Sequence, residues 1–154
     1  MSQLVATFFY VGYLRPAPGT WGSLVALIIA YGIVQYTGVL GLSIATVLAF
    51  AIGWIAITTQ ISKTKIHDPS EIVIDEVVGQ WVAVLPLAIW PLDNGISLFY
   101  WALAFLIFRL LDIKKPGLIG WADRKNTAFS VILDDVIAGL ATATVIYLAM
   151  LILN

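Results

Sequence analysis

Long stretches without a charged residue are the feature that most limits how this chain can fold. Charged residues make up 11% of its 154 residues and apolar residues 61%, against about 25% and about 45–50% in an ordinary soluble domain. Because a membrane-crossing helix needs about 20 mainly apolar residues, the pattern predicts one membrane-embedded domain over residues 1–154. It excludes a soluble enzyme and a disordered chain. The uncharged stretches are 1–14, 16–62, 77–92, 94–108 and 136–154.

These stretches predict an all-α fold, a small polytopic membrane helical bundle of about five hydrophobic spans plus short interfacial helices. Gly38 and Gly41 divide the longest stretch into two spans. Pro86 should kink the third span, because proline lacks an amide N–H. Residues 4–14 are too short to cross and suit an interfacial or re-entrant helix. The expected spans are 21–37, 40–61, 77–92, 96–111 and 136–154.

Five spans place the N-terminal segment, loop 62–76 and loop 112–135 on one side of the membrane. All eight Lys and Arg residues then lie on that side or at its membrane edge. The positive-inside rule makes this side cytoplasmic. Every acidic residue except Asp93 lies there too, so the cytoplasmic face is where chemistry is expected.

Composition excludes several kinds of protein. The chain has no cysteine, which excludes disulfides, thiolate zinc sites and cysteine nucleophiles. His67 is the one histidine, so mechanisms that need two are excluded. Eight basic against nine acidic residues leave no basic surface to bind nucleic acid.

Two pairs of adjacent carboxylates come where a charged loop enters an expected span. Asp75-Glu76 precedes span 77–92, and Asp134-Asp135 precedes span 136–154. Acidic residues at a helix N-terminus can simply cap its free N–H groups. Two adjacent acids at both places exceed what capping needs, and a divalent cation such as Mg²⁺ would relieve their repulsion. Capping and metal binding are both consistent with the spacing.

The end of the fourth span combines both signs of charge. Arg109 and Asp112 are three residues apart and share a helix face. They could form a local ion pair, or Arg109 could hold a phosphate while Asp112 binds metal. Lys114 and Lys115 follow, either as anionic-lipid ligands or as positive-inside residues.

Two weaker signals fall on the same side. Pro18-Gly19-Thr20-Trp21-Gly22-Ser23 opens the first span, where backbone N–H groups could receive an anion, although Thr20 or Ser23 could be a plain helix cap. His67-Asp68 lies in the first charged loop. A lone loop histidine is usually a surface residue, but beside a metal it could transfer protons.

These motifs, in this order, resemble the phosphatidylglycerophosphatase A family of bacterial lipid phosphatases. The similar segments are the Pro18–Ser23 motif, His67-Asp68 with Asp75-Glu76-Val77-Val78-Gly79, Phe108-Arg109-Leu110-Leu111-Asp112-Ile113-Lys114-Lys115-Pro116, Asp123-Arg124, and Asp134-Asp135-Val136-Ile137-Ala138-Gly139. One departure is the 126–133 loop, which lacks the family's glycine-rich run. Asn126, Thr127 or Ser130 would have to take over any contact that glycine N–H groups make.

The resemblance implies Mg²⁺-dependent dephosphorylation of phosphatidylglycerophosphate to phosphatidylglycerol and inorganic phosphate, at the cytoplasmic face of the bacterial inner membrane. Direct attack by water and an aspartyl-phosphate intermediate both stay open, as does the oligomeric state. The residues that it implies are Asp75, Glu76, Asp112, Asp134 and Asp135 for the metal; Gly19, Thr20, Gly22, Ser23, Arg109, Lys115 and Arg124 for the phosphate; and His67, Asp68, Asp75 and Asp135 for catalysis.

The alternative is a non-enzymatic membrane subunit or an anionic-lipid-binding protein. In a transporter, carboxylates should lie inside the spans near the membrane midplane. Here they lie at span ends, which favours chemistry at the membrane surface.

Overall fold

The computed structural model describes residues 2–64, 69–90, 94–125 and 127–153, and all regular structure in these ranges is helical. This agrees with the expected all-α class. The helices are α1 (Ser2–Ala6), η1 (Val11–Tyr13), α2 (Pro18–Thr64), α3 (Ile74–Ala83), α4 (Leu85–Ile89), α5 (Asn94–Lys114), α6 (Leu118–Asp123) and α7 (Ala128–Leu153).

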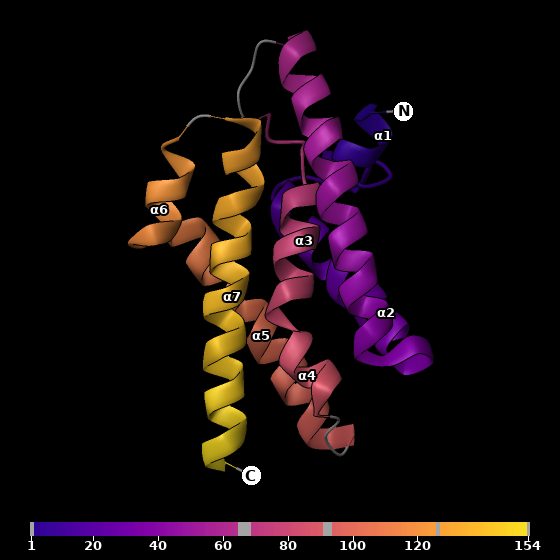
Figure 1. Ribbon diagram of the computed structural model, residues 1–154, viewed down its shortest axis with the longest axis vertical. Helices are drawn as coiled ribbons and strands as arrows, with labels where there is room; N and C mark the ends of the chain where they lie inside the picture. The colour runs from indigo at the N-terminus through magenta and orange to yellow at the C-terminus, as the bar shows by residue number, and fades with distance from the viewer. Residues whose placement is uncertain (1, 65–68, 91–93, 126, 154) are drawn as a thin grey trace.

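The longest helix, α2, consists of two arms that meet at Gly38. This residue has φ 64° and ψ −160°, outside the helical region, and glycine adopts a positive φ without a steric penalty. Figure 1 shows α2 turning back at its lower end and rising to the top of the molecule. The break expected at Gly38 between spans 21–37 and 40–61 is therefore confirmed.

The third expected span, 77–92, is interrupted next to Pro86, where a kink was expected, and the interruption divides it into two helices. The chain forms α3 and then α4, and they are separated at Val84, with φ −99° and ψ 1°. Pro86 lies in the first turn of α4, where its missing N–H costs nothing, whereas inside a longer helix it would remove a hydrogen bond and clash with the preceding turn. The interfacial helix expected over 4–14 is likewise divided, into α1 and η1.

The last helix begins earlier than expected. α7 begins at Ala128 rather than near 136, so Asp134 and Asp135 lie inside the helix and do not cap it. The N-terminal capping is done by Thr127 and Ser130, whose side chains accept hydrogen bonds from each other's backbone N–H at 3.0 and 2.9 Å. This reciprocal pair is a capping box, and it gives the glycine-free loop a structural role.

Two helices of the described chain, α2 and α7, are long and apolar enough to cross a membrane. That is fewer than the five spans expected. The last two turns of α5 carry Arg109, Asp112 and Lys114, and α3 and α4 are too short to cross singly.

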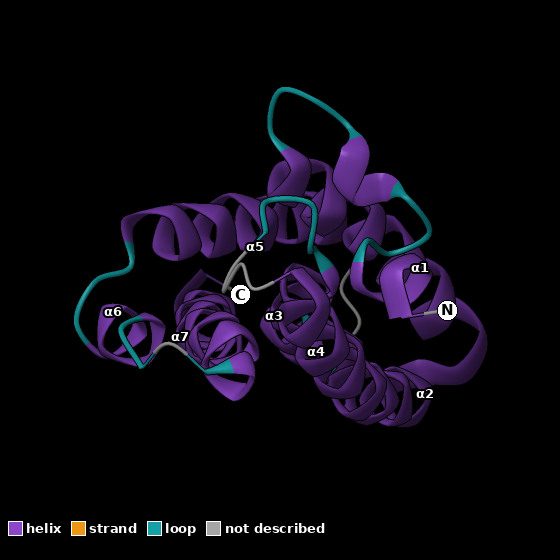
Figure 2. Cartoon of the chain, turned by 90° about the horizontal axis from the view of Figure 1, so that it is seen from above, coloured by secondary structure: helices purple, strands orange, loops and turns teal. Residues whose placement is uncertain are grey.

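The centre of the bundle is α3, of which every residue except Glu76 is buried. Both views place it between α2 and α7 (Figures 1 and 2). The Trp81 indole N–H donates to the Ala26 carbonyl of α2 at 2.9 Å. On the other side, a Cβ at Gly79 would lie only 2.7 Å from the Asp135 carbonyl oxygen. This close approach of α3 to α7 places the Asp75-Glu76 pair beside Asp135.

Candidate functional site

A cavity of about 610 Å³ lies where the charged ends of four helices meet. The start of α2, the start of α3, the end of α5 and the first turns of α7 each contribute lining residues. Segments far apart in sequence thus converge on one place, as expected from the topology. The polar lining residues include Gly19, Thr20, Ser70, Asp75, Glu76, Arg109, Asp112, Lys115, Asp123, Asp134 and Asp135.

Three carboxylates in this cavity form a compact cluster. One oxygen each from Asp75, Glu76 and Asp135 lies within 4.8 Å of the others. Asp75 and Asp135 are buried, and the Glu76 side chain is 14% exposed. Among the described residues, Glu76 Oε2 and Asp135 Oδ1 are buried without a hydrogen-bond partner. Buried anionic oxygens without a partner are costly, so the cluster has the donor set and the unmet need of a hard-cation site.

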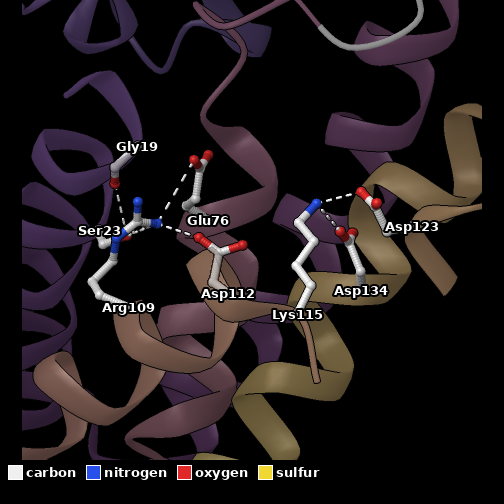
Figure 3. Close-up of polar contacts among 8 residues, drawn as sticks. All are labelled: Gly19, Ser23, Glu76, Arg109, Asp112, Lys115, Asp123 and Asp134. Atoms are coloured by element: carbon white, nitrogen blue, oxygen red, sulfur yellow. Dashed lines mark hydrogen bonds and ion pairs between the residues drawn. The ribbon is translucent and has the colours of Figure 1, made fainter. Parts of the chain in front are cut away.

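The Arg109 guanidinium lies beside Glu76, a member of this cluster (Figure 3). It forms an ion pair with Asp112, lies 3.8 Å from Glu76 Oε1, and its Nη1 donates to Ser23 Oγ at 3.4 Å. Ser23 in turn donates to the Gly19 carbonyl at 2.8 Å. The Arg109 side chain is 13% exposed, so α2, α3 and α5 together fix its position.

The absence of a side chain at Gly19 makes room for this arrangement. A Cβ there would collide with the Glu76 carboxylate and lie 3.0 Å from Arg109 Nη2. The first turn of α2 can therefore approach the charged groups directly.

A second ionic group lies on the other side of the cavity (Figure 3). The Lys115 ammonium donates to Asp123 and, at 2.8 Å, to Asp134 Oδ2. It joins the loop after α5 to α6 and α7. The carboxylates expected to bind metal thus fall into two groups: Asp75, Glu76 and Asp135 cluster together, whereas Asp112 and Asp134 each accept a hydrogen bond from a cationic side chain.

The surroundings shift two titrating groups outside the apolar spans. Burial raises the pKa of Glu76 to about 7, the Asp112 charge adds to the rise, and Asp75 and Arg109 oppose it. Burial alone would lower the pKa of Lys115, but its hydrogen bonds to Asp123 and Asp134 outweigh this and hold that pKa above its usual range.

The structure brings most of the sequence-predicted residues together. Of those predicted for phosphate, Gly19, Thr20, Arg109 and Lys115 line the cavity. Three others do not line it. Gly22 packs against Val73, Ser23 lies behind Arg109, and Arg124 is exposed on the surface. His67, Asp68 and Asn126 lie outside the described residues.

Sequence reasoning assigned no role to Asp123, although it lines the cavity and pairs with Lys115. The Asp123-Arg124 motif indicated that Asp123 could be functional, but its pairing with Lys115 depends on how α6 packs. Gln80 was also missed. It is fully buried, and neither polar atom of its side chain has a partner among the described residues.

Fold and site together define an all-helical protein with membrane-length apolar helices, in which carboxylates, a guanidinium and an ammonium surround one cavity. The family model described as phosphatidylglycerophosphatase A matches residues 4–150. The chain belongs to this family, which confirms the resemblance of its motifs.

Individual relatives match over nearly the whole chain. Phosphatidylglycerophosphatase A of Haemophilus influenzae is 34% identical over 149 residues, covering 94% of this chain and 86% of the relative. The Escherichia coli protein of the same name is 32% identical over 147 residues, covering 94% and 81%. A Bacteroides thetaiotaomicron protein provisionally named as a phosphatidylinositol-3-phosphatase is 33% identical over 149 residues, covering 95% and 91%. No solved structure matches the chain significantly.

Proposed function

We propose that this protein is a Mg²⁺-dependent phosphatase that converts phosphatidylglycerophosphate to phosphatidylglycerol and inorganic phosphate. The observation that carries the proposal is the cluster of Asp75, Glu76 and Asp135 in one cavity with the Arg109 guanidinium and the Lys115 ammonium. Metal ligands beside fixed cations are the parts from which phosphoryl-transfer sites are built. Membership of the family and the names of its relatives support the lipid substrate.

Asp75, Glu76 and Asp135 would hold the metal. Their oxygens are close enough to share one ion, and Mg²⁺ favours carboxylate oxygens while keeping ligands free for water and phosphate. When bound, the ion would neutralise part of the phosphate charge and lower the pKa of nearby water. Asp112 and Asp134 would not bind the metal directly but would position Arg109 and Lys115, with which they form ion pairs.

The cationic groups would orient the phosphate. Arg109 can present two parallel N–H groups to phosphate oxygens, and its contacts with Ser23 and Glu76 restrict its motion. The first backbone N–H groups of α2 have no partner within the helix. Gly19 and Thr20 therefore offer donors at a helix N-terminus, where anions are favoured.

Proton transfer would use a carboxylate of the cavity, with His67 or Asp68 from the loop before α3 as further candidates. In-line attack by water and attack by an aspartate would both suit the cavity. Trapping a covalent phosphoenzyme would distinguish them.

The chain would be multi-pass, with the cavity at the cytoplasmic face. The five crossings would be made by the two arms of α2, by α3 from Val77 onward together with α4, by α5 and by α7. The concentration of Lys and Arg at the cavity end supports this orientation through the positive-inside rule. A phosphate at that surface with acyl tails among apolar helices matches a lipid substrate.

A second candidate substrate is phosphatidylinositol 3-phosphate, supported by the name of the Bacteroides relative. Phosphate release by the purified protein in detergent with Mg²⁺ should be compared on three lipids: phosphatidylglycerophosphate, phosphatidylinositol 3-phosphate and phosphatidic acid. We expect the highest kcat/KM on the first. Faster phosphate release from phosphatidylinositol 3-phosphate would make that lipid the substrate. No phosphate release from any of the three lipids would favour the non-enzymatic lipid-binding alternative.

A further inference from the structure

An apolar groove lies between the same two helices, α2 and α5, that hold the Arg109 side of the cavity. Its volume is about 220 Å³, and it is lined by Leu27, Ile28, Tyr31, Leu98 and Trp101. Ile28 and Leu98 are 64% and 71% exposed, so the groove opens to the outside of the bundle.

The groove and the cavity are joined by a regular helix–helix register. At the cavity end, Arg109 donates to Ser23. At the groove, the rings of Tyr31 and Trp101 meet edge to face with centroids 5.4 Å apart. On α2, Tyr31 comes eight residues after Ser23, and on α5, Trp101 comes eight residues before Arg109. Because an α-helix rises 1.5 Å per residue, the two contacts between these antiparallel helices lie about 12 Å apart along the helices.

This distance fits one leaflet of a membrane. The hydrocarbon core is about 30 Å thick, so each leaflet contributes about 15 Å. With Arg109 at the charged membrane edge, the groove lies within the leaflet next to the cavity. The tails of a lipid whose phosphate occupies the cavity extend into that leaflet, at the depth of the groove.

We propose that this groove binds an acyl chain of the lipid whose phosphate enters the acidic cavity. The inference rests on the proposed function and adds a subsite that selects and orients the tail. Bilayer lipid is as apolar as the groove, so the gain comes from packing rather than from leaving water. Contact with the two aromatic rings would hold the tail in one direction and so add to the affinity for the lipid.

The test compares two matched substitutions on α2. Ile28→Trp places a large ring in the groove, while Ile55→Trp adds the same ring at an equally lipid-facing isoleucine, 67% exposed, on the second arm. Leu98→Trp fills the groove from the opposite wall and serves if Ile28→Trp misfolds. KM and kcat for phosphate release are measured in detergent with dihexadecanoyl and dihexanoyl phosphatidylglycerophosphate.

We expect Ile28→Trp to raise KM for the long-chain substrate about three- to tenfold, which is the size of the effect of losing one interhelical hydrogen bond in a membrane. Its kcat, its KM for the short-chain substrate, and both constants of Ile55→Trp should stay at wild-type values. Equal effects of the two substitutions, or equal effects on both substrates, would overturn the acyl-chain subsite while leaving the phosphatase intact. A wild-type protein inactive on both substrates would instead refute the proposed function, and this inference with it.

Discussion

Lys115 donates a hydrogen bond to Asp134 Oδ2 at 2.8 Å and thereby joins the loop after α5 to the second turn of α7. The Asp134 side chain is 5% exposed, and Asp123 approaches the same ammonium from α6. This contact separates Asp134 from its neighbour Asp135, which belongs to the carboxylate cluster. Two adjacent aspartates thus serve different parts of one site.

Removing Lys115 should destabilise the fold through its partner. Lys115→Met leaves Asp134 buried without a cation, and we expect a loss of about 1–3 kcal/mol in the free energy of unfolding, since the ammonium is partly solvated. Asp134→Asn in the same chain should recover part of the loss. Thermal unfolding of wild type, both single variants and the double variant gives the coupling energy, and strictly additive losses would contradict the pair.

Asp135→Asn and Asp134→Asn should differ sharply in metal binding. The first removes a proposed ligand, and we expect Mg²⁺ or Mn²⁺ affinity to fall by more than about 100-fold. The second changes a neighbouring group, for which losses of about 10–100-fold are typical. Manganese titration followed by electron paramagnetic resonance measures both. A wild-type affinity in Asp135→Asn would mean that the cluster does not bind the metal.

Metal binding should weaken as pH falls. Burial raises the pKa of Glu76 to about 7, so below that pH the metal has to displace a proton. Affinity should then drop about tenfold per pH unit below pH 7 and level off above it. Glu76→Gln should bind more weakly, with a shallower pH dependence. A wild-type affinity unchanged between pH 8 and pH 6 would argue against Glu76 as a ligand.

Gly19→Ala should damage the site without unfolding the protein. The added methyl group would collide with the Glu76 carboxylate and crowd Arg109, and we expect a loss of at least about tenfold in kcat/KM, as for other groups that orient a metal site. Gly32→Ala, in the same arm of α2, is the control because its Cβ would meet nothing within 4 Å. Similar activity in the two variants would mean that the site does not depend on the absence of a side chain at Gly19.

Part of this fold could be predicted from the sequence. The uncharged stretches located the apolar helices, and two glycines marked the turn that Gly38 makes. The start of α7 was missed, because the Asp134-Asp135 pair suggested a helix beginning after it. The Thr127–Ser130 capping box starts the helix earlier, and α7 then carries two charges among its early turns.

The grouping of the charges could not be predicted. The motifs assigned five carboxylates to metal binding, since each lies at the same end of the bundle. Which of them contact Arg109 or Lys115 depends on how α3, α5, α6 and α7 pack against one another. No single sequence motif determines that packing. The burial of Gln80 in α3 has the same origin.

Phosphate release from phosphatidylglycerophosphate with Mg²⁺, and again after chelation, tests the central claim most directly. The purified wild-type protein in detergent should release phosphate with Mg²⁺, lose that activity with a chelator, and regain it when Mg²⁺ is restored. Asp135→Asn should stay inactive throughout while keeping its helical circular dichroism. Unchanged release in the presence of chelator, or full activity of Asp135→Asn, would contradict the metal-dependent phosphatase described above.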